Sequence, residues 1–137
     1  MNHSEFGERD VNYLWIGLGG FLGANARYLL QQWAAARWGA DFPYGTLIAN
    51  VTGSFIIALF LTLATGRLPI SPEMRLFVAV GFLGGFTTFS SFSLETFRLI
   101  QDGAWRLAGL YFFGNTGLGL IGVILGVTLA QLLQRGG

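Results

Sequence analysis

The sequence predicts an all-α integral membrane protein with four transmembrane helices, the third of them broken near its middle. Of its 137 residues, 53% are hydrophobic and only 11% are charged, and the mean hydropathy is +0.56. A soluble domain usually carries about 25% charged residues. Charges are also absent from three long runs, 42–66, 76–94 and 107–134. Each run is close to the length of about 20 residues with which a helix crosses a bilayer.

The charged residues set the expected boundaries of the helices. The first uncharged run, residues 11–26, is short, so its helix must continue past Arg27 with this side chain at the headgroup layer. We expect helices over about 11–35, 45–65, 76–99 and 105–133, in one transmembrane domain over residues 11–134. Residues 1–10 form a polar tail, which we expect to be disordered and which lacks the pattern of a signal peptide. A soluble bundle needs charged outer faces, and the second and fourth helices have none.

The basic residues give no signal for one orientation in the membrane. All of them are arginines. Four spans place Arg9, Arg67, Arg75 and Arg135 on one side and Arg27, Arg37, Arg98 and Arg106 on the other. Because Lys and Arg in short loops orient membrane proteins, an even distribution leaves two interpretations. Another feature sets one orientation, or the chain inserts both ways and pairs with its own inverted copy, which is the interpretation we favour.

Glycines recur four residues apart in three of the predicted helices. The pairs are Gly19 with Gly23, Gly81 with Gly85, and Gly122 with Gly126. In lipid, small residues at this spacing let helix backbones approach closely. The pairs predict a compact bundle and indicate nothing about function.

The middle of the third helix has a different composition. Residues 81–86 read GFLGGF, and residues 87–93 read TTFSSFS, so a glycine cluster precedes five hydroxyl side chains. This pattern favours a break in the helix. At that depth irregular backbone is tolerated when it is buried in protein or lines a polar cavity, and its carbonyls could coordinate a cation. The alternative is a continuous helix whose Ser and Thr bond back to carbonyls one turn earlier.

Polar side chains on the other helices suggest a passive route for an anion. Asn50, Tyr111 and Asn115 join the hydroxyls of the third helix in a polar stripe. The rings of Phe89 and Phe92 present positive edges that can face an anion. Proton-coupled transporters use ionisable relays inside the membrane, and none lies at mid-depth. Glu95, near the end of the third helix, is expected to cap it or to reach the interface.

Several other functions are excluded or less favoured. No nucleophile, metal cluster or phosphate loop indicates an enzyme, and a net charge of +1 argues against nucleic-acid binding. A small proton-coupled multidrug or guanidinium exporter needs a carboxylate deep in the first helix, which has none. A non-conducting assembly subunit would use the polar stripe only to hold its helices together.

Three motifs in order resemble the Fluc family of fluoride channels, the CrcB-like proteins. They are GGFLGANARY at 19–28, PYGTLIANVTGSF at 43–55 and GFLGGFTTFSSFS at 81–93. The resemblance covers nearly the whole chain beyond the tail. It implies an antiparallel dual-topology homodimer in the bacterial inner membrane, with two fluoride pores. Passive fluoride export through these pores would confer fluoride resistance.

The resemblance also implies roles for individual residues. The fluoride pathway would contain Asn50, Phe89, Ser90, Ser91, Phe92, Tyr111 and Asn115. The carbonyls of Gly84 and Thr87 would hold a structural Na⁺ at the centre of the dimer, and Arg27 would lie at an aqueous vestibule. Two positions depart from the family pattern. Ser91 stands where relatives often have Thr, and Gly119 stands where relatives often have a serine in the fourth helix.

Overall fold

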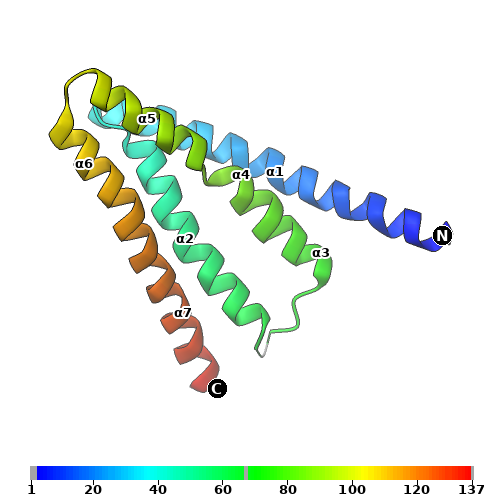
Figure 1. Ribbon diagram of the computed structural model, residues 1–137. Coiled ribbons are helices and arrows are strands. Elements are labelled where there is room, and N and C mark those ends of the chain that lie inside the picture. The colour runs from blue at the N-terminus through cyan, green and yellow to red at the C-terminus, as the bar shows by residue number, and fades with distance from the viewer. Residues whose placement is uncertain (1–2, 67, 137) are drawn as a thin grey trace.

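The computed structural model describes residues 3–66 and 68–136, with the backbone alone for residues 3–6, 8 and 9. The described residues form four helical stretches, and Figure 1 shows them arranged as a bundle. The first two are single helices, α1 (His3–Trp38) and α2 (Tyr44–Ala64). The third contains α3 (Pro72–Arg75), the π-helical segment η1 (Leu76–Leu83), α4 (Gly84–Phe86) and α5 (Phe89–Gln101). The fourth contains α6 (Trp105–Phe113), the π-helical segment η2 (Gly114–Leu118) and α7 (Gly119–Arg135).

Local sequence signals explain where most of these stretches begin and end. Gly39 follows α1 with φ of 84°, and Gly103 lies in the turn between α5 and α6 with φ of 73°. Glycine adopts such positive φ values without a steric cost. At the start of the third stretch, Ser71 Oγ accepts a hydrogen bond from Met74 N at 3.2 Å, and Pro72 takes the first helical position. Both are typical features of a helix N-terminus.

The first helix begins earlier than the sequence predicts. The backbone is helical from His3, so the disorder expected for the tail is wrong for the described residues 3–10. The tail contains no proline, and one glycine weakens a helix without ending it. Residues 1 and 2 of the tail lie outside the described part of the chain.

The helices have the lengths and compositions of membrane spans. Three stretches are long and apolar enough to cross a bilayer, namely Tyr44–Ala64, Pro72–Gln101 and Trp105–Arg135. The 36-residue helix α1 packs along η1 and α4. It therefore lies at the same depth as a membrane-crossing stretch and makes the fourth span. Many large apolar side chains face outward, which suits a protein whose solvent is lipid.

The glycine pairs bring helix backbones together, as predicted. A Cβ on Gly23 would collide with the carbonyl oxygen of Phe82, and one on Gly85 would lie 2.7 Å from the carbonyl oxygen of Gly20. The other main contact joins α2 to α7, where a Cβ on Gly126 would lie 2.5 Å from the carbonyl oxygen of Phe55. No side chain can replace glycine at such contacts without moving a helix.

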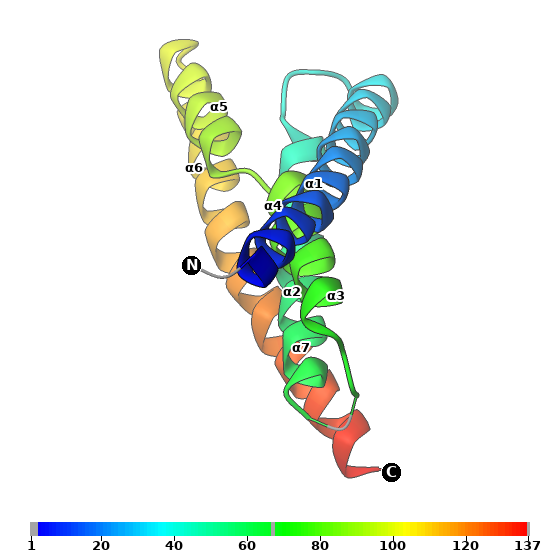
Figure 2. The same cartoon turned by 90° about the vertical axis from the view of Figure 1, so that its right-hand side faces the viewer.

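The two halves of the third stretch have different neighbours. η1 and α4 pack against α1, whereas α5 packs against α6, and Figure 2 shows α5 leaning away from α1. The outer faces of α5 and α6 keep large apolar side chains exposed, among them Phe97 at 54% and Phe113 at 72%.

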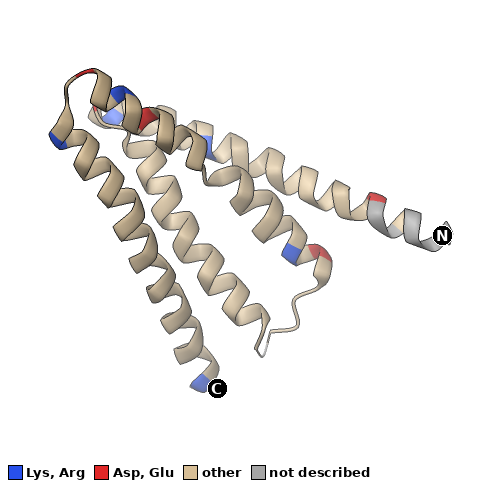
Figure 3. Cartoon of the chain, viewed as in Figure 1, with Lys and Arg blue, Asp and Glu red and all other residues tan. Residues whose placement is uncertain are grey.

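Most charged residues of the described chain lie toward the ends of the helical stretches (Figure 3). Arg37 near the end of α1, Arg98 near the end of α5 and Arg106 at the start of α6 share one end, and Arg75 of α3 and Arg135 of α7 lie toward the other. Arg67 and the side chain of Arg9 lie outside the described residues. Five of the six arginines whose side chains are described therefore lie toward the two ends, as the even distribution predicts, whereas Arg27 lies farther in and bonds to Gly85 beside the break.

Candidate ion pathway at the helix break

The third helical stretch is interrupted between α4 and α5, which confirms the predicted break. Thr87 (φ −86°, ψ 157°) and Thr88 (φ −155°, ψ 118°) are extended. Thr87 N donates to the carbonyl oxygen of Leu83 at 3.0 Å and ends the first half. Thr88 Oγ1 accepts from Ser91 N at 3.1 Å and caps the second half. Threonine caps a helix N-terminus in this way because its side chain replaces a missing carbonyl partner.

Asn50 of α2 closes the gap that the break leaves in the backbone. Its Oδ1 accepts from Thr88 N at 2.8 Å, and its Nδ2 donates to the carbonyl oxygen of Thr88 at 3.1 Å. The same Nδ2 donates to Asn115 Oδ1 at 2.9 Å. Both N–H bonds of the amide are thus in use, so Asn50 shapes the break and has no spare donor in this arrangement.

The break takes away the partners that a continuous helix would supply to the backbone carbonyls of residues 84–87, and Gly84 and Thr87 are two of these. Thr88 N, which would bond to Gly84 O, turns to Asn50 instead. Ser91 N, which would bond to Thr87 O, turns to Thr88 Oγ1. Among the described residues no hydrogen bond replaces either one. Carbonyl oxygens at an interrupted helix can accept a cation, and these two belong to Gly84 and Thr87, the residues that the family resemblance implies.

Arg27 of α1 lies beside the break. Its Nε donates to the carbonyl oxygen of Gly85 at 3.1 Å, and the side chain is half-buried between α1 and α4. Arg27 therefore ties the first helix to the segment just before the break. Its guanidinium also contributes positive charge beside the break.

The hydroxyl side chains of residues 87–93 divide into two groups. The hydroxyls of Thr87 and Ser93 donate to carbonyls four residues earlier, those of Leu83 and Phe89. A continuous helix would have required this kind of bond from all five hydroxyl residues. The hydroxyls of Thr88, Ser90 and Ser91 instead contact one another, with Thr88 Oγ1 at 3.3 Å from Ser90 Oγ and at 3.1 Å from Ser91 Oγ. This cluster at the start of α5 holds protons that can turn toward an anion.

The two predicted anion-facing rings have different environments. Phe89 is 78% exposed, whereas Phe92 is 5% exposed and packs between Tyr111 and Phe112. Their ring centroids are 5.6 Å apart with an interplanar angle of 56°. Phe89 therefore presents its ring to whatever lies outside this chain, while Phe92 belongs to the interior between α5 and α6.

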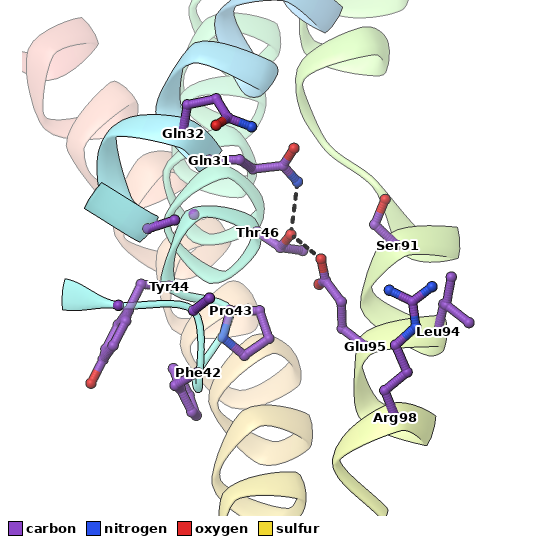
Figure 4. Close-up of a pocket in the computed structure, with 14 residues that line it drawn as sticks. Gln31, Gln32, Phe42, Pro43, Tyr44, Thr46, Ser91, Leu94, Glu95 and Arg98 are labelled. Carbon is purple, nitrogen blue, oxygen red and sulfur yellow. Dashed lines mark hydrogen bonds between the residues drawn. The ribbon is translucent and has the colours of Figure 1, made fainter. Parts of the chain in front are cut away.

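Glu95 belongs to a polar network that the sequence does not predict. Thr46 Oγ1 donates to Glu95 Oε1 at 3.1 Å and accepts from Gln31 Nε2 at 3.0 Å (Figure 4). On the other side Tyr111 OH donates to Glu95 Oε2 at 2.5 Å. The expectation that Glu95 caps the helix or reaches the interface is therefore wrong. Its position one turn after Ser91, on the same helix face, was the available signal.

This network borders an opening at one end of the bundle. A pocket of about 410 Å³ is lined by side chains that include Gln31, Thr46, Ser91, Glu95 and Arg98. A second pocket, of about 290 Å³, lies on the other side of the break, and its lining includes Asn50, Gly84, Thr87 and Phe89. Tyr111 and Asn115 are buried between them, joined by a bond from Asn115 Nδ2 to Tyr111 O at 3.0 Å. The structure thus brings the predicted residues of α2, α5, α6 and η2 together around the break.

Comparisons with known proteins agree with this arrangement. The family described as "CrcB-like protein, Camphor Resistance (CrcB)" matches residues 14–127. A protein of Roseiflexus sp. (strain RS-1), named fluoride-specific ion channel FluC, is 54% identical over 123 residues, which is 90% of this chain and 99% of the relative. Proteins of the same name from Trichormus variabilis and Clostridium perfringens are 47% and 43% identical. These matches cover 88% and 86% of this chain, and 89% and 92% of the relatives.

Proposed function

The chain belongs to the CrcB-like family, and we propose that it is a multi-pass membrane channel that lets fluoride leave the cytoplasm passively. The observation that carries this proposal is the helix break, where Asn50, Thr88 and Asn115 form a satisfied polar centre between two pockets. The agreement of names among relatives at 43–54% identity supports the choice of ion.

Fluoride is small and strongly hydrated, so a pore must replace its water with close donors. The hydroxyl cluster of Ser90, Ser91 and Thr88 supplies protons, and the ring edges of Phe89 and Phe92 supply weaker positive charge. Asn115 and Tyr111 extend the polar surface on the fourth stretch. Asn50 takes part in one of two ways. It holds these groups in place, or it gives up one of the two hydrogen bonds that its Nδ2 donates and donates that hydrogen bond to the ion instead.

The pathway is incomplete in one copy of the chain. Phe89 is 78% exposed and Ser90 is exposed, so a single copy cannot enclose an ion at this point. An antiparallel homodimer covers these residues with the exposed faces of a second copy. The placement of arginines toward both ends of the bundle supports a chain that inserts in both orientations.

A structural Na⁺ at the centre of this dimer fits the donor set. The carbonyls of Gly84 and Thr87 are left without intrahelical partners, and Na⁺ is a hard cation that prefers oxygen ligands. Gly84 and Thr87 would hold the ion, which supplies positive charge at the break and joins the two copies. Arg27 and Asn50 already donate to the carbonyls of Gly85 and Thr88, which are therefore less suited to hold the ion.

Fluoride efflux from proteoliposomes tests the proposed function. Vesicles loaded with potassium fluoride and containing the purified chain should release fluoride to an electrode when valinomycin balances the charge. The same vesicles loaded with chloride should stay closed. Equal chloride release, or no fluoride release from a correctly folded dimer, would contradict the proposal. Fluoride release that requires a proton gradient would instead favour a coupled exporter.

A further inference from the structure

Ser54 of α2 is a polar residue that has no role in the site described above. Thr46, Asn50 and Ser54 are four residues apart and therefore lie on one face of the helix. Thr46 contacts Glu95, and Asn50 holds the break. Ser54 continues the same face by one more turn, about 6 Å farther along the helix axis. Its position extends the polar surface beyond Asn50.

The fourth helical stretch offers no polar group at this level. After Thr116 its next polar side chain is Thr128. Gly119 is buried, and a Cβ there would lie 3.6 Å from Ser54 Oγ, an ordinary van der Waals contact. The hydroxyl of Ser54 thus occupies the space next to a glycine, where a side chain of the neighbouring helix would otherwise project.

Ser54 also faces the pocket beside the break. Ser54 lines the pocket of about 290 Å³ together with Asn50, Thr88 and Phe89. Its Oγ donates to the carbonyl oxygen of Asn50 at 2.7 Å. A serine hydroxyl rotates freely about its C–O bond, so this proton can turn from the carbonyl to an anion in the pocket.

We propose that Ser54 is the ion-contacting residue that continues the anion pathway past Asn50, in place of a hydroxyl at position 119. The proposal rests on the function proposed above. It assigns the end of the polar route to α2, because the glycine on the facing helix makes room for this side chain. The ligand it would contact is a small anion that accepts a hydrogen bond from the hydroxyl.

Moving the hydroxyl from one helix to the other tests this assignment. Fluoride efflux is measured for Ser54→Ala and for the double variant Ser54→Ala/Gly119→Ser. A hydrogen bond to a charged group is worth about 1.5–3 kcal/mol, so Ser54→Ala should slow efflux at least about tenfold. The double variant should recover most of the wild-type rate, since a Cβ at position 119 lies 3.6 Å from the place of the Ser54 hydroxyl and can carry a hydroxyl next to it.

The matched control is Thr52→Val on the same helix. Thr52 Oγ1 also bonds back to a carbonyl, that of Ile48 at 2.6 Å, but its residue faces outward. This variant should conduct like the wild type, which shows that loss of a back-bonded hydroxyl is harmless in itself. If Ser54→Ala does not form a dimer on size exclusion, Ser54→Cys keeps the side-chain size with a weaker donor and should show the loss instead.

The outcomes separate the two proposals. Wild-type fluoride efflux with an unaffected Ser54→Ala variant would overturn the role of Ser54 and leave the channel function standing. A slow Ser54→Ala variant that Gly119→Ser does not rescue would also overturn it, because the loss would then be structural. Absence of fluoride efflux from the wild type would overturn both proposals.

Discussion

Asn50 bonds to both backbone polar groups of Thr88, through its Oδ1 at 2.8 Å to the N–H and through its Nδ2 at 3.1 Å to the carbonyl. This pairing lets the third stretch leave helical geometry inside a membrane, where an unpaired backbone group costs several kcal/mol. The side-chain amide of Asn50 thus supplies the hydrogen bonds that a continuous third helix would have made to Thr88 from its neighbouring turns.

Replacing Asn50 should therefore weaken the fold as well as the function. Asn50→Ala leaves the N–H and carbonyl of Thr88 unpaired, and we expect the free energy of unfolding to fall by about 2–4 kcal/mol. The measurement is thermal unfolding in detergent, with fluoride efflux alongside. Asn25→Ala removes an amide that bonds only within its own helix, to Phe21 O at 2.7 Å, and should change neither. Equal effects of the two variants would contradict the role given to Asn50.

The contact between Gly23 and Phe82 should not tolerate a side chain. Gly23→Ala places a methyl group against the carbonyl oxygen of Phe82, so α1 must move away from η1. Overpacking of this kind costs about 1–3 kcal/mol. Gly17→Ala in the same helix meets no atom within 4 Å and is the control. Unfolding temperatures of the purified dimers compare the two, and an unchanged value for Gly23→Ala would show that the helices pack differently.

The bond from Tyr111 to Glu95 should contribute to stability. Tyr111 is fully buried, and Tyr111→Phe removes one of the two donors to the carboxylate. The expected loss of unfolding free energy is about 1–3 kcal/mol, because the half-buried carboxylate loses a hydrogen bond. Tyr13, which is 70% exposed, provides the control Tyr13→Phe. A stability loss confined to Tyr111→Phe in denaturant titrations would support the network.

Phe89 and Phe92 should both affect fluoride efflux but differ in their effect on stability. Phe92→Ile leaves a gap beside Tyr111 and should lower the unfolding free energy by about 1–3 kcal/mol. Phe89→Ile changes a ring that is exposed within one copy, so it should lower the stability less than Phe92→Ile does while slowing efflux. Phe97→Ile alters another exposed ring of α5, away from the hydroxyl cluster, and should conduct normally. Normal efflux in Phe89→Ile would remove this ring from the pathway.

The dual orientation can be tested cleanly because the chain contains no cysteine. Gly136→Cys introduces one thiol after α7, and an impermeant maleimide labels it from either face of the membrane. With no orientation bias from arginines, about half of the copies should react from outside and the rest only after lysis. Uniform labelling from one side would contradict the antiparallel dimer.

The features that could be predicted from sequence depend on local pattern. The break follows from glycines beside five hydroxyl residues, and the close helix contacts follow from glycines four residues apart. Both signals act over one or two turns of a single helix. The helical start at His3 was missed because a polar, charged segment without proline is compatible with either helix or disorder.

The missed features depend on how helices rotate against one another. Thr46 and Glu95 are 49 residues apart in sequence, and their bond exists only because α2 and α5 turn these faces together. No spacing rule relates positions on different helices. The same holds for Ser54 and Gly119, whose contact joins two chain segments that have no local pattern in common.

The sequence by itself therefore determined the membrane class, the site of the break and the even distribution of arginines along the chain. These properties follow from composition and from short-range periodicity, which the chain carries whatever its tertiary contacts. Only the tertiary structure decided that the Nδ2 group of Asn50 donates its hydrogen bonds to Thr88 and Asn115. The same holds for the hydrogen bonds from Tyr111 and Thr46 to Glu95, and for the position of Ser54 next to Gly119. Each of these depends on the relative rotation of packed helices, because a hydrogen bond forms only when two side chains from separate helices meet within about 3 Å.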